Sequence, residues 1–278
     1  MDTQAPPVIV ELRKVSKAFP VPGGRPRLAV EEISFSIADV PDRGQCRMIL
    51  GPSGCGKSTI LRLIAGLIEP TSGEVICGGQ LVTGPGSERG MVFQNYSSFP
   101  WLSVLDNVRF GLDLAGVPRG EGDERARQLI KRVGLEGTEA YYPKALSGGM
   151  RQRVAIARTL ACSPKIILMD EPFGALDPIT RREMQDLVAG LWFDGDLNPT
   201  FIFVTHDIEE AIFLGDSIMV MSTNPGRIIA EVESPPPTAA TREAMAQGKY
   251  NDLEQQIIGL IYGGQGGGAV SAGRILEH

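Results

Sequence analysis

The sequence predicts an α/β domain with a helical region inserted into it. Three apolar runs of strand length, at 47–50, 166–169 and 201–204, are typical of a parallel sheet buried on both faces. Each run is followed by helix start signals or by apolar residues at helical spacing. A stretch with mainly helical patterns, 103–160, separates the first run from the second. This order of elements is that of an α/β domain with a helical insertion.

The N-terminal part adds antiparallel strands to this plan. Residues 8–14 and 33–37 alternate apolar with polar side chains, as antiparallel strands with one buried face do. Between them, the Pro- and Gly-rich segment 20–26 predicts a loop. Residues 70–90 are rich in Gly, Pro, Ser and Thr and predict short strands. We therefore expect an antiparallel β subdomain beside the main sheet.

The first helix is expected just after the strand at 47–50. Apolar residues in 59–65 share one helical face, and Gly66 lies near the expected C-terminus. The inserted helical stretch is expected to contain loops at 116–122 and 134–144.

Helix start signals follow the other two apolar runs. Asp177 is a candidate N-cap, and Pro178 takes the first helical position behind it. Asp207 and Glu210 have the spacing of a capping pair. Near the C-terminus, an amphipathic stretch from 253 to 261 predicts a short helix, and a Gly-rich run follows it.

Composition restricts the possible functions. The chain has 278 residues and a net charge of −6. This acidic balance argues against non-specific nucleic-acid binding, although a local basic groove stays open. No apolar stretch approaches the ~18 residues that a membrane-spanning helix requires. The four cysteines form no CxxC pair and no Cys/His cluster, which indicates free thiols in a reducing compartment. We therefore expect no nucleic-acid partner and no membrane span in this sequence.

The segment after the first apolar run matches the phosphate-binding pattern G-x-x-x-x-G-K-[ST]. Its residues, here called the P-loop, are Gly51, Pro52, Ser53, Gly54, Cys55, Gly56, Lys57, Ser58 and Thr59. Its glycines let backbone N–H groups approach phosphate without a clashing Cβ. Lys57 would supply charge to the β- and γ-phosphates, and the Ser58 hydroxyl would bind Mg²⁺. Because the pattern lies between a predicted strand and a predicted helix, we expect a site for magnesium ATP here.

Candidate catalytic side chains follow the other apolar runs. Asp170 and Glu171 end the second run, and they point differently because side chains alternate along a strand. We expect Asp170 to hold Mg²⁺ through its water shell and Glu171 to act as general base or to position the attacking water. His206, after the third run, could hydrogen-bond the γ-phosphate. Gln94, at the end of a short apolar strand, could reach Mg²⁺ or the attacking water.

A second glycine motif lies at Leu146–Gln152. Ser147 is a candidate N-cap for the helix that follows. Gly148 and Gly149 leave the first amides of that helix uncovered, which creates a second possible anion site ahead of Met150. Taken alone, the motif would be no more than a well-capped helix.

With these motifs in this order, the chain resembles the ATP-binding cassette (ABC) ATPases. The likeness consists of the P-loop, the loop at Gln94, the signature at 146–150, the acidic strand end at 166–171, the loop at 174–177 and His206. It covers roughly residues 8–234. It implies a P-loop NTPase core with an antiparallel β subdomain and an inserted helical subdomain at about 97–160. A C-terminal tail with a short helix, 235–278, lies outside the resemblance.

The resemblance implies a pair of such domains arranged head to tail, either a homodimer or a pair with a second ABC ATPase. Each ATP, with its Mg²⁺, would lie between the P-loop of one copy and Ser147–Met150 of the other. Asp177 would work across that interface. Phe19 matches the position of an aromatic residue that stacks on adenine, although Tyr is commoner there. Two bound ATPs would close the dimer and hydrolysis would reopen it.

Three stretches indicate a narrower group within the family: Gln94–Val108, Pro172–Asp177 and Asn224–Ile228. They resemble importer ATPases of the nitrate, sulfonate, taurine and bicarbonate group. Such a system implies a transmembrane permease and a periplasmic or extracellular solute-binding protein, with this subunit peripheral on the cytoplasmic face of the inner membrane. Phe99, Pro100 and Trp101 could line the groove for the permease's coupling helix, or they could pack within the inserted helices.

Other interpretations stay open. A non-transport ABC protein usually has two cassettes or long coiled-coil inserts, which this chain lacks. A P-loop kinase is disfavoured by the signature, and a GTPase by the lack of N-K-x-D. An ABC unit for another solute, for lipid trafficking or for export is excluded only weakly. The tail helix could dock on the core, contact the dimer partner or regulate. The transported solute is undetermined because this subunit need not touch it, and residues 276–278 are set aside as a possible tag remnant.

Overall fold

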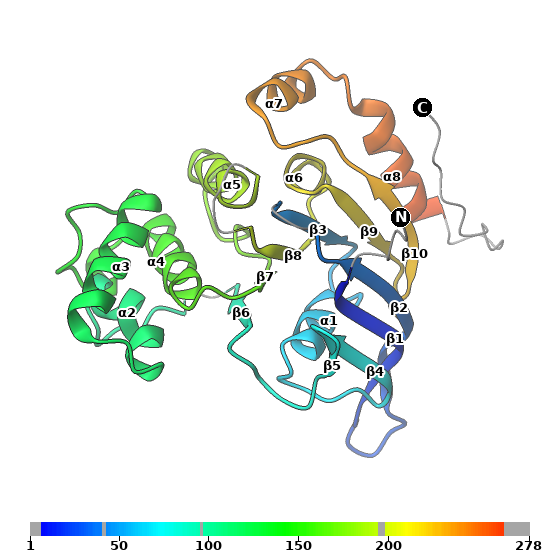
Figure 1. The fold of residues 1–278 in the computed structure, drawn as a ribbon. Helices are drawn as coiled ribbons and strands as arrows, with labels where there is room; N and C mark the ends of the chain where they lie inside the picture. The colour runs from blue at the N-terminus through cyan, green and yellow to red at the C-terminus, as the bar shows by residue number, and fades with distance from the viewer. Residues whose placement is uncertain (1–6, 41–42, 95–96, 194–197, 264–278) are drawn as a thin grey trace, which may run out of the picture.

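The computed structural model describes residues 7–40, 43–94, 97–193 and 198–263. It contains a six-stranded sheet and a four-stranded sheet (Figure 1). The larger sheet consists of β10 (Ile228–Glu233), β9 (Ser217–Met221), β3 (Gln45–Leu50), β8 (Thr200–Thr205), β7 (Ile166–Asp170) and β6 (Arg89–Val92), in that order. All its pairs are parallel except β9 with β10. The predicted α/β class is confirmed.

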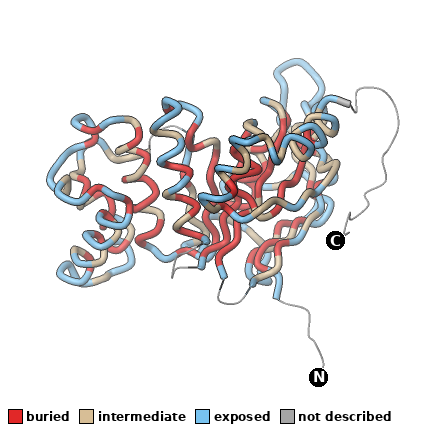
Figure 2. Tube along the Cα trace, turned by 90° about the horizontal axis from the view of Figure 1, so that it is seen from above, coloured by how far each residue is buried: buried red, intermediate tan, exposed pale blue. Residues whose placement is uncertain are grey.

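The larger sheet is buried on both faces, as its continuous apolar runs predicted. Successive residues of β7 enter different hydrophobic clusters, with Ile167 and Met169 on one face and Ile166 and Leu168 on the other. Helix α1 (Lys57–Ile64) belongs to one cluster, while α5 (Pro178–Trp192) and α6 (Ile208–Leu214) belong to the other. Figure 2 shows this buried layer running through the middle of the molecule.

The smaller sheet is antiparallel, in agreement with the alternating N-terminal pattern. Its order is β2 (Arg27–Ala38), β1 (Val8–Phe19), β4 (Ser72–Cys77) and β5 (Gln80–Leu81). Strand β1 pairs with both β2 and β4. Its buried face shares a hydrophobic cluster with α1, so the two sheets enclose that helix between them.

The inserted helices form a separate group at one end of the molecule (Figure 1). They are α2 (Val104–Leu114), α3 (Arg119–Arg132), the short 3-10 helix η1 (Pro143–Ala145) and α4 (Gly148–Ala161). The predicted loop at 116–122 is wrong in its second half, because α3 begins at Arg119. Gly122 suggested a loop but lies buried against α2, where a Cβ would stand 3.3 Å from the Arg109 side chain. A small residue here lets the two helices approach.

The tail contains two helices, of which the sequence predicted one. The amphipathic stretch lies within α8 (Asn251–Gly263), where Ile257 is fully buried and contributes to the core. Helix α7 (Ala239–Ala246) was not predicted. Residues 264–268 of the Gly-rich run and the possible tag at 276–278 lie outside the described residues. None of the helices in the described part combines the length and the hydropathy needed to cross a bilayer.

Candidate functional site

The P-loop wraps around the side chain of its own lysine. Gly54 and Gly56 adopt left-handed φ angles of 78° and 101°, which a residue with a Cβ would rarely adopt. The Lys57 ammonium, in a side chain that is 3% exposed, donates to the carbonyl oxygens of Gly51 and Pro52 at 2.9 and 3.1 Å. The buried Lys57 ammonium is therefore hydrogen-bonded to two neutral acceptors of the loop itself.

Gly226, which the sequence motifs did not single out as a site residue, packs against the P-loop from outside. A Cβ on Gly226 would lie 1.9 Å from the carbonyl oxygen of Cys55. The Gly226 amide donates to Ala29 of β2 at 3.1 Å, and its carbonyl accepts from the Glu31 amide at 3.0 Å. The loop is thus clamped between β2 and the segment 224–228, one of the stretches that resembled importer ATPases. That resemblance was the available signal for this position.

The magnesium candidates Ser58 and Asp170 lie together. The Ser58 hydroxyl donates to Asp170 Oδ1 at 2.6 Å, and Asp170 is 5% exposed at the end of β7. Gln94 is exposed after β6, the strand that pairs with β7, and its amide nitrogen is 3.9 Å from where a Cβ on Gly174 would be. The hydrogen bonds of the described residues include none between Gln94 and the Ser58–Asp170 pair. Two of the three candidates are therefore in contact in this chain.

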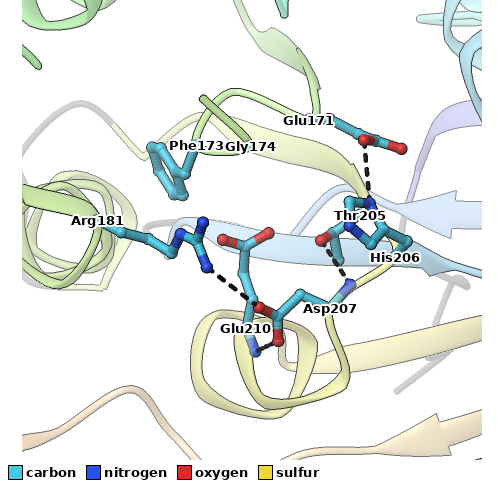
Figure 3. A pocket seen from close by; sticks show the side chains of 8 residues that line it. All are labelled: Glu171, Phe173, Gly174, Arg181, Thr205, His206, Asp207 and Glu210. Carbon is cyan, nitrogen blue, oxygen red and sulfur yellow. Dashed lines mark hydrogen bonds and ion pairs between the residues drawn. The ribbon is translucent and has the colours of Figure 1, made fainter. Parts of the chain in front are cut away.

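Glu171 lies between Lys57 and His206. Its Oε1 is 3.4 Å from Lys57 Nζ, and its Oε2 is 3.0 Å from His206 Nδ1 (Figure 3). Its φ of 43° is sparsely populated by non-glycine residues, and its amide donates to Val204 of β8 at 3.1 Å. Asp170 and Glu171 thus point to different partners, as their alternation along the strand suggested. The carboxylate is held in contact with two cationic or hydrogen-bonding groups at the sheet edge.

Beyond Glu171 and His206, a small pocket opens between α5 and α6. Its eight lining residues are Glu171, Phe173, Gly174, Arg181, Thr205, His206, Asp207 and Glu210 (Figure 3). Its volume of about 50 Å³ suits a few water molecules and is far too small for a nucleotide. The pocket is therefore too small to be the nucleotide site itself.

The predicted capping pair at the start of α6 is half correct. The Asp207 side chain accepts from the Glu210 amide at 3.0 Å. The Asp207 amide donates to Thr205 Oγ1 at 3.0 Å. The Glu210 side chain therefore does not accept the hydrogen bond from this amide that a capping box requires. Its carboxyl instead turns inward, is 5% exposed and accepts from Gln185 at 3.2 Å. Burial raises the pKa of Glu210 to about 7, against hydrogen bonds from Thr205 and Gln185 that lower it.

The signature segment lies apart from the P-loop within one chain. Figure 1 shows α4 and α1 separated, with β6 and β7 between them. The exposed Ser147 caps α4 by accepting from the Met150 amide at 3.2 Å. Gly149 packs on α5, where a Cβ would stand 2.5 Å from Thr180 Cγ2. The start of α4 therefore needs glycine for its packing, and Gly148 beside it is half-buried.

Asp177 caps α5 as predicted. It accepts from the amides of Ile179 and Thr180, both at 3.1 Å. Hydrogen bonds from the Thr180 side chain and amide lower the pKa of the exposed Asp177 carboxyl. The carboxylate is thus satisfied by its own helix, on the surface of the chain.

Of the remaining aromatic candidates, Phe19 and Trp101 are exposed and Phe99 is half-buried. Phe19 ends β1 with 37% of its surface exposed, and the Lys17 ammonium lies 5.4 Å from its ring centre. Phe99 packs on Phe110 at 4.7 Å between ring centres and on Trp101 at 5.5 Å. Trp101 is 70% exposed and Pro100 beside it is exposed as well. Asn95 and Tyr96, part of the same importer-like stretch, lie outside the described residues.

Comparisons with known proteins show which family the chain resembles in sequence and fold. The family model described as ABC transporter matches residues 30–174. A taurine import ATP-binding protein of Rhizobium johnstonii is 46% identical over 244 residues, which cover 86% of this chain and 91% of that protein. A dimeric ATP-binding cassette in a post-hydrolysis state, bound to ADP and Pi, has a TM-score of 0.68 and 33% identity, covering 81% of this chain and 99% of that one. The structure of cbiO1 from Clostridium perfringens, described as part of the ABC transporter complex cbiONQ, has a TM-score of 0.71 and 28% identity, covering 90% of this chain and 97% of that one.

Proposed function

The chain belongs to the ABC transporter family of ATPases, and we therefore propose that it is the ATP-hydrolysing subunit of a bacterial importer for a small anion such as nitrate, sulfonate, taurine or bicarbonate. The observation that carries the proposal is the cluster of Lys57, Glu171 and His206 at the edge of the sheet, beside the Ser58–Asp170 pair. The similarity to a taurine import ATP-binding protein supports the choice of substrate class.

At the P-loop, the lysine is prepared for a phosphate. Its ammonium is buried, with two backbone carbonyls and one carboxylate within 3.4 Å. A triphosphate would offer Lys57 charged oxygens in place of the neutral carbonyls of Gly51 and Pro52, and charged oxygens form stronger hydrogen bonds than neutral acceptors do. The phosphate oxygens would also compete with the Glu171 carboxylate for Lys57, which would release Glu171. The backbone amides of the loop and the N-terminus of α1 would bind the remaining phosphate oxygens.

The Ser58–Asp170 pair fits Mg²⁺. The two side chains supply oxygen donors 2.6 Å apart, and Mg²⁺ is usually bound by one or two protein oxygens, water and substrate phosphates. Ser58 would bind the ion directly, and Asp170 and Gln94 would hold it partly through water. When bound, the ion would neutralise charge on the β- and γ-phosphates.

Glu171 and His206 would act on the γ-phosphate and the attacking water. Once released by Lys57, the Glu171 carboxylate would accept a proton from water or orient it. His206 would hold Glu171 through Nδ1, as in the present geometry, or bind a γ-phosphate oxygen. Phe19, at the exposed end of β1, would stack on adenine.

Two copies are needed to complete each site. Ser147 and the amides at Gly148, Gly149 and Met150 lie on a different part of the chain from the P-loop, so they would bind the γ-phosphate of a partner's ATP. Asp177, exposed at the start of α5, would face the partner across that interface. The partner is a second copy of this chain or a related ABC ATPase. ATP binding would close the pair and hydrolysis would open it.

The working assembly would place this subunit on the cytoplasmic face of the inner membrane, bound to a permease. The exposed side chains of Pro100 and Trp101, with the half-buried Phe99 beside them, offer a surface for the permease's coupling helix. A solute-binding protein outside the membrane would deliver the anion to the permease.

Two experiments test the proposal. Steady-state phosphate release by Glu171→Gln should fall about 100-fold or more, with ATP binding retained. Glu74→Gln, which removes an exposed carboxylate on β4, should behave as wild type. Affinity purification from native membranes should recover a permease. Normal turnover by Glu171→Gln would remove the catalytic role, and recovery of ribosomes instead of a permease would overturn the transport function.

A further inference from the structure

Helix α7 of the tail is linked to the His206 turn by a chain of polar side chains. Arg242 on α7 donates through Nη1 to Gln185 Oε1 of α5 at 3.4 Å. Gln185 Nε2 donates to Glu210 Oε1 of α6 at 3.2 Å. The Glu210 amide donates to Asp207 Oδ1 at 3.0 Å, and Asp207 directly follows His206. The chain of contacts thus runs from the tail to the site of hydrolysis.

The middle of this chain is buried and has a defined direction. Gln185 is 7% exposed and Glu210 is 5% exposed. The Gln185 amide presents its oxygen to the guanidinium and its NH₂ group to the carboxyl, which is the orientation that satisfies both neighbours. Reversing the amide would set its NH₂ group against the guanidinium and its oxygen against the Glu210 carboxyl oxygen, and both mismatches are costly in a low-dielectric interior. The Gln185 side chain therefore connects α7 to α6 through two hydrogen bonds.

At the α7 end of this chain of contacts, Arg242 is held in place by several contacts. The Arg242 guanidinium donates from Nε and Nη2 to Asp186 Oδ1 at 3.1 and 2.6 Å. It also lies over the Phe213 ring of α6, 3.6 Å from the ring centre. Because the guanidinium is planar and anchored through Nε and Nη2, its Nη1 group points at Gln185 in a fixed direction. The entry to α7 is tied to α6 as well, through the Ser234 hydroxyl and the Ile212 carbonyl at 2.7 Å.

At its other end, this chain of contacts reaches the turn after β8 and the segment before α5. Arg181 of α5 lies 3.8 Å from Asp207 Oδ2 and donates to the Leu176 carbonyl at 3.3 Å, one residue before Asp177. Glu210 lines the same small pocket as Glu171 and His206. A displacement of α5 or Glu210 would therefore move the backbone that carries His206 and the segment that carries Asp177.

We propose that Arg242, Gln185 and Glu210 are positioning residues through which helix α7 sets the placement of the His206–Asp207 turn. The proposal rests on the role of Glu171 and His206 in ATP hydrolysis given above. Its physical basis is that rates of enzymic reactions are sensitive to displacements of about 1 Å, which can cost roughly 100-fold. The tail would thus tune turnover without contacting nucleotide.

The test uses the full chain with Arg242→Met and Gln185→Leu. Each variant should lower kcat for ATP hydrolysis about 3- to 10-fold while KM for ATP stays the same, because positioning of a catalytic group is lost and nucleotide binding is not. The double variant should be no slower than the slower single variant, since both break one chain of contacts. Lys249→Met, which removes a positive charge from an exposed position in the same tail, is the matched control.

A second measurement reports on His206 directly. The chain has two histidines, and each ring has two C–H groups, so the Cε1–H region of its ring carbon–proton spectrum contains two histidine signals, assigned with His206→Gln. Arg242→Met and Gln185→Leu should shift the His206 signal, and Lys249→Met should leave it in place. A purely structural role for α7 would change thermal stability without moving this signal. Arg242 is 29% exposed, so Arg242→Met carries the test even where Gln185→Leu fails to fold.

Unchanged kcat and an unchanged His206 signal in folded Arg242→Met would overturn the proposal. Additive losses in the double variant would overturn it too, because the residues would then act separately. Failure of the proposed function is a distinct result. In that case Glu171→Gln keeps its turnover, whereas failure of this inference alone leaves Glu171→Gln inactive and Arg242→Met fully active.

Discussion

The two glycine motifs of this chain lie in very different surroundings. The P-loop is completed by its own chain: the Lys57 side chain is 3% exposed and contacts two carbonyls, and Ser58 contacts Asp170. The signature serine, Ser147, is exposed, and its hydroxyl accepts only from its own helix among the contacts of the described residues. An enclosed P-loop lysine and an exposed serine at the second motif are the surroundings that the proposed pairing with a partner requires.

The largest effect expected from this difference comes from combining two inactive variants. Lys57→Ala damages the P-loop end, and Ser147→Arg blocks the signature end, so each alone should lose about 100-fold or more in ATPase activity. In a co-expressed 1:1 mixture, half of the dimers are mixed and each holds one intact site. Phosphate release should therefore recover to roughly one quarter of the wild-type value.

The control pairs two lesions at the same end. Lys57→Ala combined with Glu171→Gln leaves no intact site in any dimer, so that mixture should stay inactive. If the first mixture also stays inactive, the two motifs do not meet across an interface.

A smaller effect is expected from substitutions that disturb the packing of only one of the two glycine motifs. Gly226→Ala would place a Cβ 1.9 Å from the Cys55 carbonyl and should displace the P-loop, weakening ATP binding to a single chain by about 10-fold. Gly149→Ala would place a Cβ 2.5 Å from Thr180 Cγ2, displacing α4 from α5. It should leave ATP binding to the single chain unchanged while lowering the ATPase activity of the dimer. Calorimetric titration of dilute protein distinguishes them, and equal losses of binding would contradict the separation.

The smallest expected effect concerns Glu210, which is buried between α6 and α5. Glu210 has a pKa of about 7 in the folded chain against 4.5 ordinarily, so the folded state binds the proton more tightly. Its contribution to stability is full below pH 4.5 and is lost as the pH rises to about 7. Glu210→Gln removes this dependence, and its unfolding free energy should exceed that of wild type by up to about 3 kcal/mol above pH 7.

Urea titrations at several pH values measure the effect. Glu243→Gln, at an exposed position on α7, should follow the wild-type pH dependence. A constant difference between Glu210→Gln and wild type from pH 4 to pH 8 would show that Glu210 does not titrate in this range.

The elements that formed contiguous patterns were predictable, and those that depend on distant neighbours were not. The apolar run ending in Asp170 and Glu171 predicted a buried strand with two carboxylates pointing differently, and this is the observed arrangement. Helix α7 was missed because it is short and is held by Arg242 on α5 and α6. The inward turn of Glu210 was missed because local spacing favours a cap, while Gln185 on another helix offers the competing partner.

Contiguous residues were sufficient to predict the α/β class, the glycine-rich turn between β3 and α1, and the two carboxylates at the end of β7. The reason is that a strand's burial and a loop's backbone freedom are local properties, carried by hydrophobic runs and by glycines at set positions. Packing between elements decided the rest. Gly226 is required because β2 and the P-loop close on it from two directions, and Glu210 is buried because α5 covers it. Such contacts join residues far apart in the chain, and their distances follow from the assembled fold.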